Sequence, residues 1–191
     1  MVFILHPYGD VNPRSGWYGD RIPRDTAPTW AFLADVGSEV GVIHVKVERD
    51  RYPRQVAEYW GRDDIVYLED DKLPTAEDLD DILRCPHKFC MFPYPSSLGG
   101  LDTVEKWTAG AFPFGLGFCK FTLEAQRACP PSTWPFDKFL PTQCDKIIET
   151  PLIEKFGPMP LHPRMIAHNH WPTFREQLRQ GGKAALKKVG L

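Results

Sequence analysis

Short apolar runs alternate with helix-forming segments through the first half of the chain, and this alternation most constrains the fold. Strands are expected at residues 2–5, 40–47, 64–68 and 88–92. The third run, DIVYL, is typical of a buried strand because β-branched and aromatic residues fill it. With helices between the strands, the order β-α-β-α-β-α-β predicts an α/β fold with a mostly parallel sheet flanked by helices.

Three helices are expected between these strands. Helix-start residues and apolar faces place the first two at about residues 26–36 and 53–60. The third is expected at residues 75–84, where Thr75 and Asp78 have the spacing of a capping box. These helices are expected to cover the faces of the sheet.

The second half of the chain is less regular. Residues 93–117 are rich in proline, glycine and aromatic residues, and helices are expected at about 122–128, at 134–140 and from residue 173 onward. The last of these is a basic amphipathic helix. Since no repeat or long linker interrupts the chain, we expect one domain over residues 1–191, with an α/β half (1–92) and an irregular half (93–191).

Composition narrows the class of protein. The chain has 23 Lys and Arg against 25 Asp and Glu, a formal net charge of -2, whereas proteins that hold nucleic acid through its phosphates usually carry a basic excess. No apolar run is long enough to span a bilayer, and no signal peptide is evident at the N-terminus. We therefore expect a cytoplasmic protein with reduced cysteines, no membrane association and no obligate protein partner.

Three consecutive acids, Glu69, Asp70 and Asp71, directly follow the predicted strand 64–68. Ligands bind at the carboxyl ends of strands in open parallel sheets, and adjacent carboxylates repel one another unless a cation lies among them. Hard cations such as Mg²⁺ or Mn²⁺ prefer such oxygen ligands together with phosphate oxygens. The same residues also fit a solvated acidic turn before a helix N-terminus.

Several motifs follow the acidic triplet in order along the chain. They are residues 64–74 (DIVYLEDDKLP), 85–95 (CPHKFCMFPYP), 115–118 (GLGF), Trp134 with Asp137, and 168–170 (HNH). In this order they resemble GT-A-fold glycosyltransferases, whose fold is Rossmann-like. More narrowly, the chain resembles the small phage and actinobacterial glycosyltransferases associated with TET/JBP-type DNA hypermodification.

The resemblance implies a site for a nucleotide-sugar, a UDP-sugar first, in the half 1–92. Glu69, Asp70 and Asp71 would bind the donor and its metal. The Mn²⁺ or Mg²⁺ ion would be held by Asp71, and His168 or His170 would complete its ligands. This chain departs from a strict DxD motif because its triplet begins with Glu69, which keeps the charge on a longer side chain.

An inverting transferase also needs a carboxylate that accepts the proton of the attacking hydroxyl. The resemblance places this base on a helix after the acceptor loop, which selects Asp137, with Asp145 and Glu149 as alternatives. Asp137 also fits a surface carboxylate paired with Lys138.

The glycine-rich stretch before residue 118 is a candidate acceptor-binding loop. Gly115 and Gly117 would allow close approach of the backbone, and Trp107 would offer a stacking face. The same residues also fit a turn with aromatic residues packed in the core.

A zinc site is one interpretation of the spacing of Cys85, His87 and Cys90. A structural zinc site needs four ligands, usually from two paired motifs, and the sequence contains no second motif of this kind. We therefore predict no zinc. The string HNH at 168–170 lacks the surrounding sequence of an HNH nuclease.

Together these features predict a metal-dependent glycosyltransferase whose acceptor is a hydroxymethylated pyrimidine in phage DNA, in which case the host cytoplasm is its location. The basic tail from residue 173 would contact DNA phosphates, although a solvated helix face explains it too. The alternatives are transfer to a small molecule, protein or glycan, a non-catalytic nucleotide-sugar-binding protein, and a metal-dependent nuclease or phosphodiesterase.

Overall fold

A computed structural model describes residues 1–9, 23–48, 51–95, 103–105, 116–141 and 143–168. The strands are β1 (Val2–Gly9), β2 (Gly41–Val47), β3 (Asp64–Leu68), β4 (Lys72–Leu73), β5 (Phe89–Met91), β6 (Phe118–Phe121) and β7 (Ala167–His168). The helices are α1 (Pro23–Val36), α2 (Tyr52–Ala57), α3 (Ala76–Arg84), α5 (Leu123–Ala128), α6 (Cys144–Phe156) and the short 3₁₀ helix η2 (Pro131–Thr133).

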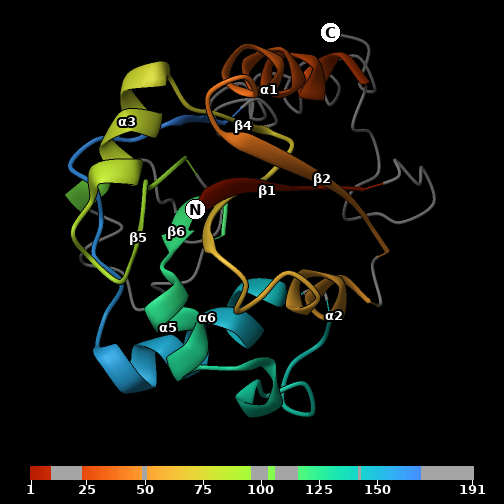
Figure 1. The fold of residues 1–191 in the computed structure, drawn as a ribbon, viewed down its shortest axis with the longest axis vertical. Coiled ribbons are helices and arrows are strands. Elements are labelled where there is room, and N and C mark those ends of the chain that lie inside the picture. Colours follow the sequence, from red (N-terminus) through yellow and green to blue (C-terminus); the bar gives the residue numbers. More distant parts are fainter. Residues whose placement is uncertain (10–22, 49–50, 96–102, 106–115, 142, 169–191) are drawn as a thin grey trace, which may run out of the picture.

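Five strands form the central sheet in the order β2-β1-β3-β6-β5 (Figure 1). Strand β1 pairs in parallel with both β2 and β3, whereas β6 is antiparallel to β3 and to β5. Four of the five strands therefore run in one direction, which confirms the predicted α/β class and the mostly parallel sheet. The antiparallel strand comes from the irregular half of the chain and lies inside the sheet.

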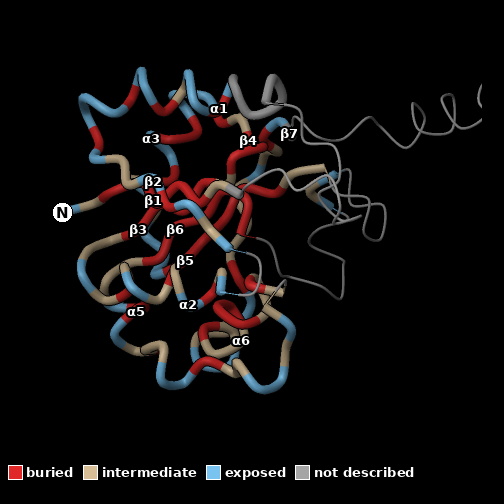
Figure 2. Tube along the Cα trace, turned by 90° about the vertical axis from the view of Figure 1, so that its right-hand side faces the viewer, coloured by how far each residue is buried: buried red, intermediate tan, exposed pale blue. Residues whose placement is uncertain are grey.

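The alternation of side chains along the strands divides the core into two layers. Leu5, Ile65 and Tyr67 pack on one face, whereas Ile4 and Val66 pack on the other. Helices α1 and α3 cover the face of Ile4, and α2, α5 and α6 cover the opposite face (Figure 2). Among the described residues, no helix combines the length and the apolar character needed to cross a membrane.

A second sheet of two short strands places the end of the described chain beside the acidic triplet. Strand β4 follows the triplet directly and pairs antiparallel with β7, so that Lys72 is opposite His168 and Leu73 opposite Ala167. The sequence analysis predicted neither strand, because runs of two residues carry no periodicity.

The elements that were predicted best are those determined by residues close together in the sequence. Strand β3 has the predicted bounds, and α3 begins with the predicted capping box. The Thr75 hydroxyl accepts a hydrogen bond from the Asp78 backbone N–H at 3.2 Å, and the Thr75 backbone N–H donates to the Asp78 carboxylate at 2.8 Å. Two backbone N–H groups at the start of the helix are thus satisfied.

Other predictions were wrong at particular residues. Strand β1 extends to Gly9 rather than ending at residue 5, and α1 begins at Pro23. Residues 134–140 form turns and not a helix. Helix α6 was not predicted, because Pro151 in its interior argues against a helix, and β6 was missed because four residues after a glycine-rich loop give a weak pattern. The predicted helix from residue 173 lies outside the described residues.

Candidate functional site

The acidic triplet forms a tight turn at the carboxyl end of β3. The Glu69 backbone N–H donates to the Gly117 carbonyl at 2.9 Å, and the Lys72 backbone N–H donates to the Glu69 carbonyl at 3.2 Å. Asp70 and Asp71 are buried, at 5% and 3% exposure, whereas the side chain of Glu69 is 27% exposed. The triplet is therefore not a solvated turn: two of its three carboxylates lie inside the protein.

A buried lysine neutralises part of this negative charge. The Lys72 ammonium donates to the Asp71 carboxylate and, at 3.1 Å, to that of Glu69, and it lies 4.4 Å from the centre of the Tyr94 ring. Burial alone would lower the pKa of Lys72, but the charges of Asp71 and Glu69 and the hydrogen bonds to them raise it above its ordinary value. Lys72 is therefore a permanent cation within the turn.

Helix α6 brings two further carboxylates into the electrostatic neighbourhood of the triplet. The charges of Glu69, Asp145 and Glu149 all act on Tyr94, whose pKa is raised first by burial and then by these acids. The pKa of Asp145 is also raised, mainly by burial, while a backbone hydrogen bond at Lys146 opposes the shift and the charge of Glu69 adds to it. Acids from β3 and α6 thus meet around Tyr94.

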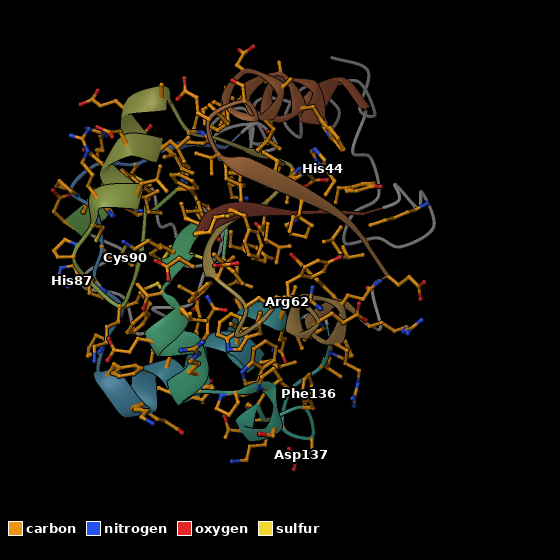
Figure 3. All side chains as sticks on the ribbon, in the orientation of Figure 1. His44, Arg62, His87, Cys90, Phe136 and Asp137 are labelled. Carbon is orange, nitrogen blue, oxygen red and sulfur yellow. The ribbon has the colours of Figure 1, made fainter. Side chains whose placement is uncertain are left out.

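The structure separates Asp137 from this cluster. Asp137 lies in an exposed turn at the bottom of Figure 3, whereas β4, which follows the triplet, lies in the upper part of Figure 1 in the same orientation. Asp145, one of the two alternatives for the base, is the carboxylate that interacts with Glu69. Of the candidate bases, Asp137 therefore lies away from the triplet, whereas Asp145 lies within its electrostatic influence.

Of the two histidines predicted as metal ligands, His168 is the last described residue of the chain. The backbone of His168 forms β7 and is paired with Lys72, next to Asp71 along the chain. His170 lies outside the described residues. The pairing brings the backbone of His168 beside the strand that follows the acidic triplet, although the two are far apart in the sequence.

Of the predicted acceptor-binding residues, Trp107 and Gly115 lie outside the described residues. Gly117 lies close to the acidic turn, and its missing side chain makes room for Lys72 and Tyr94. A Cβ atom there would lie 2.7 Å from the Lys72 Cε atom and closer still to the Tyr94 ring. Gly117 therefore allows the buried lysine to reach Asp71.

A pair of histidines in the middle of β1 and β2 was missed in the sequence. His6 and His44 are partners in the strand register, and their Nδ1 atoms are 2.9 Å apart. Trp30 of α1 stacks on His44 with ring centres 4.4 Å apart. Burial, and secondarily the charge of His44, lowers the pKa of His6 to about 4. The available signal was His6, a histidine that directly follows the apolar run 2–5 and lies in the strand that extends it.

Comparisons with known proteins give fold-level similarity alone. No protein-family model matches the chain, and no curated protein matches its sequence. The solved structure titled "Crystal Structure of A197 from STIV" has 16% identity and a TM-score of 0.46, with 87% of this chain and 80% of that chain covered. A glycosyltransferase involved in glycosylation of the major capsid of PBCV-1 has 12% identity and a TM-score of 0.45, with 94% and 97% covered. These scores are too low to assign a function.

The charges of this arrangement have the chemistry that a cation and a phosphorylated ligand would require. The three acids of the triplet and Lys72 leave a formal charge of -2 at the carboxyl edge of the sheet, and Asp145 and Glu149 add acidic groups nearby. A divalent cation among these groups would reduce their mutual repulsion, and its remaining coordination positions would suit phosphate oxygens.

Proposed function

We propose that this protein is a glycosyltransferase that binds a nucleotide-sugar, a UDP-sugar first, at the carboxyl end of β3. The observation that supports the proposal is the meeting of the acidic turn, the buried Lys72 and the α6 carboxylates around Tyr94 at this edge of the sheet. Ligands of mostly parallel α/β sheets bind at this edge. The donor diphosphate would lie against the turn.

The proposed cofactor is Mn²⁺ or Mg²⁺, held by Asp71 and Glu69 with the His168 segment beside them. The donor set fits a hard cation because it offers carboxylate oxygens and carries a net negative charge even with Lys72 included. When bound, the cation would neutralise the charge that develops on the leaving nucleoside diphosphate. Lys72 holds the two carboxylates in place through its hydrogen bonds to both.

The proposed base is Asp145. A carboxylate whose pKa is raised by burial accepts a proton more readily than an exposed one, and general-base catalysis is most efficient when the pKa lies near the working pH. Glu149 lies one turn further along α6 and is fully buried. It adds to the negative field that keeps the Tyr94 hydroxyl protonated.

The proposed acceptor is a hydroxymethylated pyrimidine in phage DNA, and this part rests on the sequence resemblance alone. A substituent at C5 of a pyrimidine projects into the major groove, so that its hydroxyl is accessible without full extrusion of the base. Transfer to DNA predicts a steep salt dependence of acceptor binding, whereas transfer to a small molecule, protein or glycan predicts a weaker one.

A turnover assay tests the proposal. Purified protein is incubated with a panel of nucleotide-sugars and Mn²⁺, with and without duplex DNA that contains 5-hydroxymethylpyrimidines, and the released nucleoside diphosphate is measured. We expect release that requires one donor class and the metal, and that Asp71→Asn abolishes. Asp137→Asn is the matched control and should retain full activity. If no nucleotide-sugar is consumed with any acceptor, and none binds, the proposal is wrong.

A further inference from the structure

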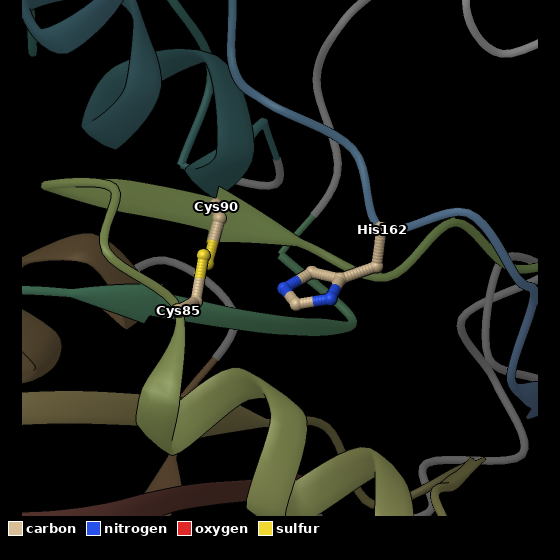
Figure 4. Close-up of side chains that lie close together, drawn as sticks. All are labelled: Cys85, Cys90 and His162. Atoms are coloured by element: carbon tan, nitrogen blue, oxygen red, sulfur yellow. The ribbon is translucent and has the colours of Figure 1, made fainter.

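A cluster of soft metal ligands, made of two thiols and one imidazole, is separate from the acidic turn. Cys85 caps the C-terminus of α3, Cys90 lies on β5, and His162 lies in the segment that leads to β7. Their ligand atoms all lie within 4.8 Å of one another. Figure 4 shows one ring nitrogen of His162 directed at the two sulfur atoms. Neither the acidic turn nor the proposed transfer reaction uses these residues.

The imidazole of His162 is held in an orientation that suits a ligand. Its ring stacks on Phe92 with ring centres 4.0 Å apart, and its backbone N–H donates to the Met91 carbonyl at 2.9 Å. Its buried Nε2 atom has no hydrogen-bond partner within the described part of the chain. The ring is therefore fixed in place with one buried nitrogen that no hydrogen bond within the described chain occupies.

The two thiols are close enough to act together. Both cysteines are free, and the side chain of Cys85 hydrogen-bonds to that of Cys90. Burial, followed by this hydrogen bond, raises the pKa of Cys90. The ammonium of Lys120 donates to the Cys85 carbonyl and brings positive charge to the cluster.

We propose that Cys85, Cys90 and His162 bind Zn²⁺ as a three-ligand site. Two thiolates and one imidazole are the ligand types that zinc prefers over the harder cations Mg²⁺ and Mn²⁺. Binding forms two Zn–S bonds and one Zn–N bond, releases the two thiol protons to solvent and involves no electron transfer. Zinc takes four ligands, so the fourth position holds a water molecule or an exogenous ligand.

The three proposed ligands line a pocket of about 360 Å³, which would leave room for a fourth ligand. Charged and polar residues of the pocket wall are Asp81, Arg84 and His87. A site with three protein ligands and an open position is typical of zinc that contacts small ligands, whereas purely structural sites are closed. The three ligands come from the end of α3, from β5 and from the segment before β7. A bound zinc ion would therefore connect these elements and stabilise the position of β7 beside the acidic turn.

Cobalt substitution tests the proposal directly. The reduced full-length protein is titrated with Co²⁺, and the thiolate-to-cobalt charge-transfer absorption is recorded, followed by displacement with Zn²⁺ and measurement of zinc per chain after gel filtration. We expect one tightly held metal per chain. Cys85→Ser, the half-exposed ligand, should abolish the charge-transfer band, and His162→Gln should weaken binding at least about tenfold.

Cys129→Ser is the matched control, because Cys129 is a free and buried thiol outside the cluster. It should leave the absorption and the metal content unchanged. Since substitution of a buried residue can unfold the protein, each variant is first compared with the wild type by far-UV circular dichroism, and the wild-type stoichiometry stands as a second measurement.

Two outcomes would overturn the proposal. The first is a reduced wild-type protein that shows no charge-transfer band and retains no zinc. The second is a Cys85–Cys90 disulfide that forms in air with loss of two titratable thiols, while the reduced protein ignores zinc; the pair would then be a redox couple and not a metal site.

Discussion

The acidic turn and the thiol–imidazole cluster differ in how their polar atoms are satisfied. In the acidic turn, Asp71 and Glu69 already have a cation, since Lys72 donates to both. In the thiol–imidazole cluster, by contrast, the Nε2 atom of His162 is buried without a hydrogen-bond partner among the described residues. The first cluster can persist as it is, whereas the second gains most from an added ion.

The difference shows that residues adjacent in the sequence do not identify a site that still lacks an ion. Three consecutive acids draw attention, yet the next residue along the chain supplies their counter-ion. The softer cluster draws its third ligand from a distant segment, which local spacing cannot reveal. A cation in the acidic turn must therefore share its ligands with Lys72, whereas zinc must displace protons.

The largest expected effect is the pH dependence of zinc binding. Because two thiol protons are displaced, the observed affinity should rise about hundredfold for each pH unit below the thiol pKa values. Mn²⁺ binding to the acidic turn displaces no thiol proton and should vary much less. Calorimetric titrations at several pH values measure both slopes, and equal slopes for the two metals would remove the distinction between the clusters.

Asp145→Asn should lower kcat by about 10² to 10⁴, the usual contribution of a general base. In the wild type, the acid limb of the kcat profile should lie above the normal range of an Asp carboxyl, since burial raises the pKa of Asp145 and the base must be ionised to act. Steady-state kinetics across pH measure this. The control Asp137→Asn should change kcat little, and a larger loss in that control would restore Asp137 as the base.

Lys72→Met makes the acidic turn resemble the other cluster by removing its internal cation. The buried Asp71 carboxylate would lose its partner, and breaking a buried ion pair costs about 3 to 5 kcal/mol of unfolding free energy. Urea unfolding measures the loss, and Mn²⁺ should restore part of it. The exposed pair of Lys88 with Glu124 is the control, because Lys88→Met should cost less than about 1 kcal/mol.

His6 is a buried imidazole outside the thiol–imidazole cluster, and it adds a third case to the comparison of buried polar groups. Its pKa falls from 6.5 to about 4 on folding, so the unfolded state binds the proton more tightly. Its contribution to stability is complete above pH 6.5 and is lost as the pH falls toward 4, by at most about 3 kcal/mol. Unfolding of wild type and His6→Gln across this range measures the difference, and parallel curves for the two proteins would contradict it.

The sequence predicted the features that depend on neighbouring residues. Strand β3, the capping box of Thr75 and Asp78, and the position of the acidic triplet at a strand end all follow from patterns within a few residues. The mostly parallel sheet also followed from the order of elements. The antiparallel β6 did not, because its place between β3 and β5 is decided by packing across the whole sheet.

The composition of the site depends on contacts between distant segments. Asp145 comes within the electrostatic influence of Glu69 because α6 packs against the sheet, and a helix with an internal proline gave no sequence signal for that packing. Backbone hydrogen bonds between the segment of His162 and Met91 place His162 near Cys90. Lys72, by contrast, directly follows the triplet in the sequence. Its burial, which the sequence does not reveal, decides that its ammonium neutralises the acids rather than facing solvent.

The central claim is that the acidic turn binds a nucleotide diphosphate with a divalent cation. The most direct measurement is a calorimetric titration of UDP into the wild-type protein and into Asp71→Asn, each with and without Mn²⁺. We expect saturable binding to the wild type that requires Mn²⁺ and that is lost in Asp71→Asn. If UDP and the other nucleoside diphosphates give no binding heat with the metal present, or if Asp71→Asn binds as tightly as the wild type, the claim is contradicted.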